Sequence, residues 1–220
     1  MAPTGEGPRR PAGSSAALSA RVVMLAVLRQ RNFALVWVAG LISLTGDWLL
    51  FVAVPVAVYQ LTGSTAATAA AVAARVLPRL ALGSVAGVFV DRWDRRRTML
   101  VANLLLGLCL LPLLLVRSAE WLWLLYLVSF AQSTLAQFLG PAENALLPCL
   151  VAEADLVPAN ALNGLNDNLA RLVGPPLGGL IVAGWGLTGA ALLDAASFFA
   201  ASGLVALVAT DGRAARVSTA

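Results

Sequence analysis

Three charged side chains lie in the middle of long apolar stretches of this sequence. Asp47 falls inside the stretch 34–60, and Arg75 and Arg79 fall inside 66–90 with the i, i+4 spacing that places both on one face of a helix. A charge at the centre of a bilayer costs about 2.5–3.5 kcal/mol on insertion scales. Because charges retained there usually bind substrate or couple ions, these residues are candidates for a polar site within a membrane.

The spacing of these residues predicts which of them meet. A turn between the two stretches is centred near Gly63; Asp47 lies sixteen residues before it and Arg79 sixteen residues after it. At 1.5 Å per residue, antiparallel helices would hold the two at about the same depth. We therefore expect an Asp47–Arg79 or Asp47–Arg75 ion pair beside a polar cavity. A purely structural ion pair is the alternative.

Polar residues in later apolar stretches add further candidates. Gln132 and Gln137 lie at mid-depth, where helix–helix hydrogen bonding explains them as readily as substrate contact. Asp167 and Arg171 have i, i+4 spacing and can form a local ion pair. Asp194 is a weaker candidate, because it lies near an expected helix start and we expect it to interact only with that helix end. The candidates for the substrate cavity or coupling site are Asp47, Arg75, Arg79, Gln132 and Arg171.

The composition excludes most other chemistry. Of 220 residues, 60% are apolar and 12% are charged, against roughly 25% charged residues in a soluble domain. The chain has no His, and its two cysteines, Cys109 and Cys149, are far apart, so we expect no enzyme, no metal and no cofactor. The net charge of +4 could indicate nucleic acid, but the arginines flank apolar runs. We therefore expect the lipid bilayer as a partner, and no nucleic acid.

The apolar stretches predict an all-α, polytopic membrane protein. Six of them approach the ~20 residues that a spanning helix requires. They lie at 34–60, 66–90, 98–116, 121–141, 161–184 and 187–209. The expected organisation is a disordered tail and amphipathic lead-in at 1–32, a six-helix bundle at 33–209 and a linker or tail at 210–220.

The arginines predict the orientation of the bundle. Five lie in the N-terminal segment, four in the loop 91–97 and two after residue 209, whereas Arg117 is the one arginine expected in a loop on the opposite side. Since positively charged loops stay in the cytoplasm, we expect both termini there and the protein in the cell membrane. The acidic loop 142–160 is expected to lie as a helix on the cytoplasmic surface.

Two glycine motifs predict close helix packing. Gly83 and Gly87 form a G-x-x-x-G face, and residues 174–179 read Gly-Pro-Pro-Leu-Gly-Gly. Small residues at such spacing let two helix backbones approach closely. The paired prolines remove backbone donors and bend the helix.

These motifs resemble those of the major facilitator superfamily. Residues 87–96 (GVFVDRWDRR) are similar to its loop 2–3 signature, and 174–179 is similar to the end of its helix 5 antiporter motif. Further pieces resemble its drug:proton antiporter branch, which includes macrolide-efflux proteins and the enterobactin exporter. They are Gly46-Asp47, 59–64, 141–148, 159–162 and 193–195.

The resemblance implies roles for individual residues. Gly87 would let helix 2 approach helix 11 of the other half, and Asp91 would join a charge network that latches the outward-facing state. Arg92, Arg95 and Arg96 would be the cations of this gating loop. The residues of the helix 5 motif would be Gly174, Pro175, Gly178 and Gly179.

The chain departs from the superfamily's pattern at several positions. Asp94 stands where the loop often has Gly, and Ala161 and Ala170 stand where the helix 5 motif has glycines. The helix 4 arginine of many proton antiporters has no counterpart; Gln132 and Gln137 are the nearest polar residues. These departures leave the route of proton coupling open.

The superfamily fold has twelve helices in two halves with the substrate site between them, and this chain contains six expected helices. The resemblance therefore implies an N-terminal half that works with a second six-helix half or as a homodimer. Its implied function is export of a small-molecule substrate, a hydrophobic drug-like compound or a siderophore, by alternating access in antiport with protons. The alternatives are a non-transporting membrane scaffold or partner subunit, and a truncated inactive fragment.

Overall fold

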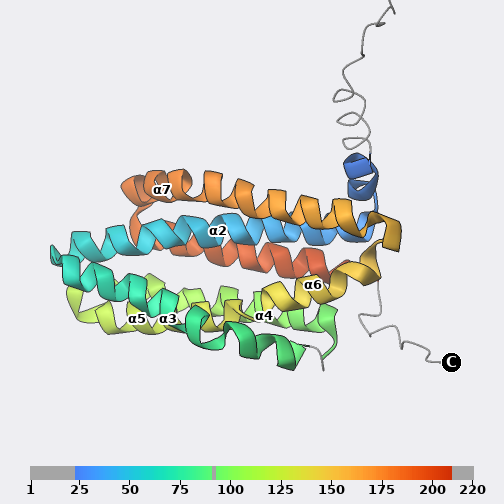
Figure 1. Ribbon diagram of the computed structural model, residues 1–220. Helices are drawn as coiled ribbons and strands as arrows, with labels where there is room; N and C mark the ends of the chain where they lie inside the picture. The colour runs from blue at the N-terminus through green and yellow to red at the C-terminus, as the bar shows by residue number, and fades with distance from the viewer. Residues whose placement is uncertain (1–22, 91–92, 210–220) are drawn as a thin grey trace, which may run out of the picture.

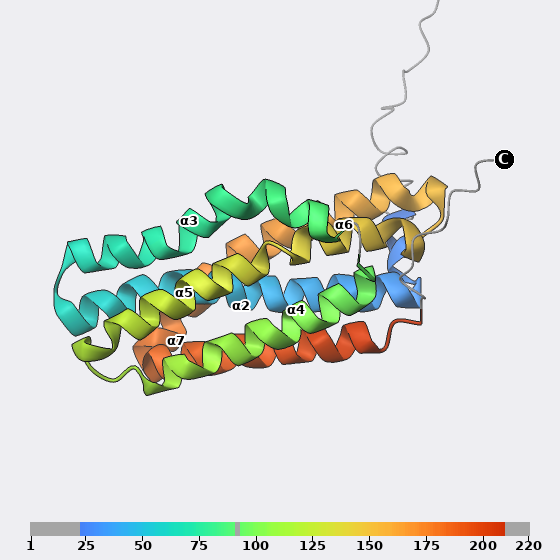
Figure 2. The ribbon, with the colours of Figure 1, turned by 90° about the horizontal axis from the view of Figure 1, so that it is seen from below.

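Long helices run side by side and build the whole of the described fold (Figures 1 and 2). The computed structural model describes residues 23–90 and 93–209, and for 83–90 it describes the backbone alone. The helices are α2 (Arg31–Thr62), α3 (Thr65–Val90), α4 (Arg95–Leu110), α5 (Leu122–Ala136), α6 (Leu139–Leu150) and α7 (Leu156–Ala206). Short 3-10 turns at Leu111–Leu115, Ala119–Trp121 and Glu153–Asp155 connect them. The predicted all-α class is confirmed.

Helix α7 contains two of the six expected apolar segments. Gly186 breaks it with φ 64° and ψ −166°, a conformation that is essentially restricted to glycine. Figure 1 shows α7 turning back at one end of the bundle, so that its two arms, 156–185 and 187–206, run in opposite directions beside α2. The described residues therefore contain six apolar helical segments, as the sequence predicts.

The expectation that residues 142–160 lie as a helix on the surface is correct about the helix at 142–150 but wrong about its surface location. Helix α6 continues the direction of the fourth segment and buries Ala142, Leu146 and Leu147, so the apolar stretch runs from Ala119 to Leu150. Pro141 explains the break between α5 and α6, because it has no N–H to donate to the carbonyl of Gln137. In the first turn of α6 that missing donor costs little, and the new helix begins there.

The buried side chains form two apolar clusters with a polar layer between them. One cluster packs residues such as Leu50, Leu106 and Leu125 near the Gly63 turn, and the other packs residues such as Phe33 and Leu146 at the opposite end. Along α2 the clusters are separated by residues 40–48, a length of about 12 Å. The buried polar side chains include Ser43, Asn103, Ser129, Gln132, Ser133, Asn166 and Asp194. This polar layer positions the candidate site.

Some expectations concern residues that the structure does not describe. The tail at 1–22, the segment 210–220, Asp91 and Arg92 lie outside the described residues, as do the surroundings of Gly83 and Gly87. Within the expected amphipathic lead-in, residues 23–28 are helical; Val27 is fully buried, whereas Leu25 is exposed.

Candidate functional site: a polar cavity and its charge network

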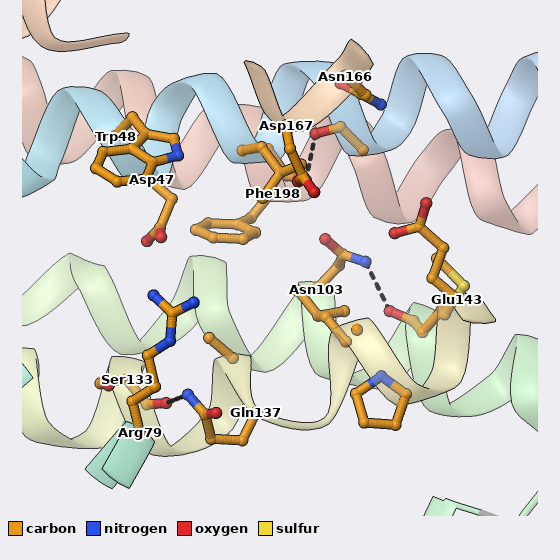
Figure 3. Close-up of a pocket in the computed structure, with 18 of the residues that line it drawn as sticks. Asp47, Trp48, Arg79, Asn103, Ser133, Gln137, Glu143, Asn166, Asp167 and Phe198 are labelled. Atoms are coloured by element: carbon orange, nitrogen blue, oxygen red, sulfur yellow. Dashed lines mark hydrogen bonds between the residues drawn. The ribbon is translucent and has the colours of Figure 1, made fainter. Parts of the chain in front are cut away.

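A cavity of about 470 Å³ lies within the polar layer (Figure 3). Helices α2 to α7 all contribute side chains to its wall. Its charged lining residues are Asp47, Arg75, Arg79, Glu143, Asp167 and Arg171. A cavity of this size is in the range of small-molecule sites, and its wall combines apolar and charged groups.

The ion pair predicted from the spacing is present, and its cation is Arg75. The Nη2 atom of Arg75 lies 2.5 Å from Asp47 Oδ1 and donates a second hydrogen bond to the carbonyl of Asp47 at 2.9 Å. The guanidinium also lies 5.5 Å from the centroid of the Phe51 ring. Arg79, which the depth argument matched most closely to Asp47, instead lies exposed on the cavity wall and reaches toward the Asp47 side (Figure 3).

Gln132 joins this ion pair to a second carboxyl group. Its Nε2 donates to Asp47 Oδ1 at 3.0 Å and to Asp194 Oδ2 at 3.3 Å, while its Oε1 lies 3.5 Å from Arg75 Nη1. Asp194 is fully buried and also accepts a hydrogen bond from Ser197. The four side chains therefore form one network from α2, α3, α5 and the second arm of α7.

The expectation that Asp194 serves only a helix end is wrong. Asp194 lies eight residues after the break at Gly186, well inside the helical arm. A Cβ on Gly46 would collide with Asp194 and Ser197, so the missing side chain at Gly46 gives Asp194 its place against α2. Of these two neighbouring residues, Gly46 thus leaves space for the carboxyl group of Asp194, and Asp47 supplies the other carboxyl group of the network.

The local pair expected between Asp167 and Arg171 is absent. Arg171 instead places its guanidinium 5.1 Å from the centroid of the Trp48 ring, where a cation interacts favourably with the ring face. Gln137, in contrast, bonds within its own segment, because its Nε2 donates to the carbonyl of Ser133 one turn earlier. Arg171 lines the cavity, as expected of a candidate site residue.

The helix 5 motif packs α7 closely against α2. A Cβ on Gly174 would lie 2.9 Å from the carbonyl oxygen of Thr45, and one on Gly178 would collide with the backbone of Leu49. Gly179 faces open space, and Pro175 lies within a helix that continues to Gly186. Two of the four motif residues therefore allow the close backbone approach that the sequence predicts.

The described part of the loop before α4 binds the ends of other helices. Asp94 caps α4 by accepting a hydrogen bond from the N–H of Arg97 at 2.8 Å. Arg96 donates to the carbonyls of Val205 and Ala206 at the end of α7, and Arg95 contacts Cys149 Sγ at 3.5 Å. These arginines thus tie the second arm of α7 and the end of α6 to the start of α4.

Comparison with known proteins identifies the architecture. The sequence profile of the transmembrane secretion effector family matches residues 22–219. The chain belongs to this family of the major facilitator superfamily. The order of the described helices and the glycine packing of α2 on α7 agree with the resemblance seen in the sequence.

Relatives in this family include named exporters. YfiS of Bacillus subtilis, an uncharacterised transporter of the superfamily, is 33% identical over 159 residues, which is 72% of this chain and 37% of the relative. Macrolide efflux protein A of Streptococcus pyogenes is 28% identical over 179 residues, 80% of this chain and 44% of the relative. The enterobactin exporter EntS of Shigella boydii is 32% identical over 160 residues, 70% and 38% respectively. The matched part therefore spans less than half of each relative.

The sequence analysis missed several cavity residues of this major facilitator chain, among them Glu143, Asn103 and Asn166. Glu143 was assigned to a surface loop, but it lines the cavity from α6. Asn103 and Asn166 are almost completely buried and line the same cavity. Asn103 carries the signal that identified Asp47, an isolated polar residue within an apolar stretch, whereas Glu143 and Asn166 each lie next to other polar residues.

Proposed function

We propose that this chain forms one half, the N-terminal half, of an efflux transporter. The complete transporter would export hydrophobic drug-like compounds or siderophores by alternating access, in antiport with protons. The names of the macrolide and enterobactin exporters among its relatives support this substrate range. The site would comprise Asp47, Arg75, Gln132 and Asp194, with Arg79 and Arg171 on the cavity wall.

The observation that carries this proposal is the charged network in the middle of an apolar bundle. Asp47, Arg75 and Asp194 lie between two clusters of buried aliphatic and aromatic side chains. Carrying these groups into a bilayer is costly, and apolar residues of similar size would often give a more stable bundle. The cost is explained if the network binds, releases or relays something that crosses the membrane.

The exposed faces of α3 and of the first arm of α7 support a partner for this bundle. Leu80 on α3 is 78% exposed, and Leu172 and Leu180 on α7 are 72% and 71% exposed. Both helices also line the cavity, so one side of the site lies between two apolar surfaces. We propose that a second six-helix half, or a second copy of this chain, covers these surfaces and closes the cavity.

We further propose that the ends of the bundle near Arg29 and Arg95 face the cytoplasm and that the protein resides in the cell membrane. We also propose the domain organisation at 1–32, 33–209 and 210–220. Gly87, Asp91 and Arg92 would act with Arg95 and Arg96 as the gating loop, since Arg96 binds the end of α7 and Arg95 contacts the end of α6. The variants Glu120→Cys and Glu153→Cys test this orientation when intact cells are labelled with a membrane-impermeant maleimide. The cysteine at position 120 should react from outside, and the one at position 153 should not.

Flux in vesicles tests the transport activity. The chain, alone and together with any second six-helix half encoded beside it, is reconstituted in proteoliposomes and assayed for rhodamine 6G uptake with and without a pH gradient. We expect gradient-dependent uptake that Asp47→Asn lowers at least tenfold, whereas the exposed Glu120→Gln leaves it unchanged. Absence of flux in both preparations would refute the proposal and favour a scaffold or an inactive fragment.

A further inference from the structure

Two acidic side chains form a second charged group in the cavity, apart from the Asp47 network. Glu143 extends from α6 and Asp167 from the first arm of α7, and both line the cavity (Figure 3). A Cβ on Gly40 would lie 3.9 Å from Glu143 Oε1, which places this carboxylate beside Gly40 of α2. Since Gly40 precedes Asp47 by seven residues, the acidic end lies about 10 Å along α2 from the ion pair.

Two of the three cavity cations are engaged elsewhere, and the third, Arg79, lies exposed on the cavity wall and reaches toward the Asp47 side (Figure 3). Arg75 binds Asp47, and Arg171 lies over the Trp48 ring. Within the described part of the chain, neither Glu143 nor Asp167 has an ion pair or a hydrogen bond to its carboxylate. Two carboxylates without a cation between them repel each other and favour a positively charged occupant.

Two buried amide oxygens give this end of the cavity further acceptors. Asn103 is 3% exposed, and its Nδ2 donates to the carbonyl of Met99 at 2.8 Å, which turns its Oδ1 into the cavity between the acidic residues (Figure 3). Asn166 is also buried, and its Nδ2 donates to the carbonyl of Trp37. The Oδ1 atoms of both residues have no hydrogen-bond donor. A buried acceptor without a partner is costly, so a ligand that donates hydrogen bonds is expected there.

We propose that Glu143, Asp167 and Asn103 form a subsite for a protonated amine of the transported compound. The positive charge would lie between the two carboxylates, and one N–H would donate to Asn103 Oδ1. Charge alone satisfies the carboxylates, but only an N–H satisfies the amide oxygen, so the subsite prefers an ammonium group to a quaternary one. This inference rests on the proposed transport function for its biological meaning and on the cavity geometry for its chemistry.

Binding of matched fluorescent probes tests the subsite. The chain is placed in lipid nanodiscs and titrated with dansylcadaverine, with its neutral N-acetyl derivative and with its trimethylammonium derivative; empty nanodiscs give the background. We expect dansylcadaverine to bind at least tenfold more tightly than the acetylated probe and severalfold more tightly than the quaternary probe. Equal affinity for all three probes would overturn the proposal.

Variants assign the preference to the named residues. Glu143→Gln should weaken dansylcadaverine binding about tenfold and leave the acetylated probe unchanged, whereas the exposed Glu153→Gln, which also removes one negative charge, should change neither. Asn103→Leu should abolish the preference for ammonium over trimethylammonium. Its control is Asn168→Leu, because Asn168 also donates to the carbonyl one turn earlier but does not line the cavity.

The outcome is separable from that of the transport assay. A thermal unfolding midpoint within a few degrees of the wild type identifies variants that fold, and Glu143→Asp, which retains the charge, should recover most of the affinity. If the probes bind as expected but vesicles show no flux, the subsite stands and the transporter proposal fails. If flux is present and Glu143→Gln and Asn103→Leu leave the probe preferences unchanged, the subsite is refuted and transport stands.

Discussion

Breaking the Asp47–Arg75 ion pair should reveal how much the network contributes to the bundle. The informative set is Asp47→Asn, Arg75→Gln and the double variant, because a double-mutant cycle separates the pair's coupling from other effects of each change. Asp47→Asn keeps the side-chain volume nearly constant and removes only the charge. Arg75→Gln removes the charge and also shortens the side chain, and the cycle cancels that part of its effect if it is the same in both backgrounds.

The geometry sets the expected magnitude. Exposed pairs contribute about 0–1 kcal/mol, whereas breaking a buried pair costs about 3–5 kcal/mol. The side chain of Arg75 is 12% exposed and that of Asp47 is 33% exposed, so this pair lies between the two limits. We expect a coupling free energy of about 2 kcal/mol. Arg75 retains its bond to the backbone carbonyl of Asp47 in Asp47→Asn, so Arg75→Gln should be the more damaging single change.

Asp194 supplies a decisive extension of the cycle. In Arg75→Gln the carboxylates of Asp47 and Asp194 share the amide of Gln132 without the nearby cation, and like charges then face each other. Asp194→Asn should therefore be more favourable in the Arg75→Gln background than in the wild type, by about 1 kcal/mol or more. A change of the same size in both backgrounds would show that Asp194 does not sense the ion pair.

The measurement is reversible unfolding in mixed micelles, followed by tryptophan fluorescence as the fraction of denaturing detergent rises. The matched control is Arg79→Gln with Asp47→Asn, since Arg79 lies one turn from Arg75 but makes no ion pair within the described residues. These two changes should be additive within about 0.5 kcal/mol. A coupling below 0.5 kcal/mol for Asp47 and Arg75 would refute the reasoning.

Three further changes test the helix packing by the same unfolding measurement. Gly178→Val should destabilise the bundle by about 1–3 kcal/mol or more because its side chain meets the backbone of α2, whereas Gly179→Val, facing open space, should cost far less; equal losses would contradict the packing. Asp94→Ala should lower the free energy of unfolding by about 0.5–2 kcal/mol through loss of the α4 cap, whereas Asp94→Asn, which can still cap the helix, should keep most of the wild-type stability. Equal stability of Asp94→Ala and the wild type would contradict the capping role. Gly186→Ala should cost about 1–3 kcal/mol because its φ is positive, and Gly184→Ala, with ordinary helical geometry, is the control that should change little.

Much of the fold could be predicted from the sequence because lipid restricts the choice of structure. A stretch of about 20 apolar residues has to form a helix in hydrocarbon, so six stretches predict six helical segments. Asp47 and Arg75 could be paired because a turn near Gly63 fixes two antiparallel helices, and depth then follows from residue number. The same arithmetic matched Arg79 more closely than Arg75, since it gives depth but not the direction in which a side chain points.

The errors in the sequence analysis arise where a residue's partner lies on a distant segment. Asp194 was judged by its position in its own helix, but Gln132 and Gly46 define its surroundings. Arg171 was paired with Asp167 by helical spacing, but Trp48 of α2 provides the ring on which it lies. Local spacing predicts which groups can meet within one helix, and tertiary packing decides whether they do.

The cavity joins two electrostatically different ends across a short distance. At one end the carboxylates meet arginine and glutamine, so their charges are compensated within the bundle. At the other end Glu143 and Asp167 lie beside amide oxygens that lack donors, and neither carboxylate is paired with a cation of the described residues. A compound with an ammonium group and an apolar body would satisfy the second end and could lie along the aromatic rings of Trp48 and Phe51. Release then requires only that the covering partner move and readmit water, because hydration offsets the lost attraction between the ammonium group and the carboxylates.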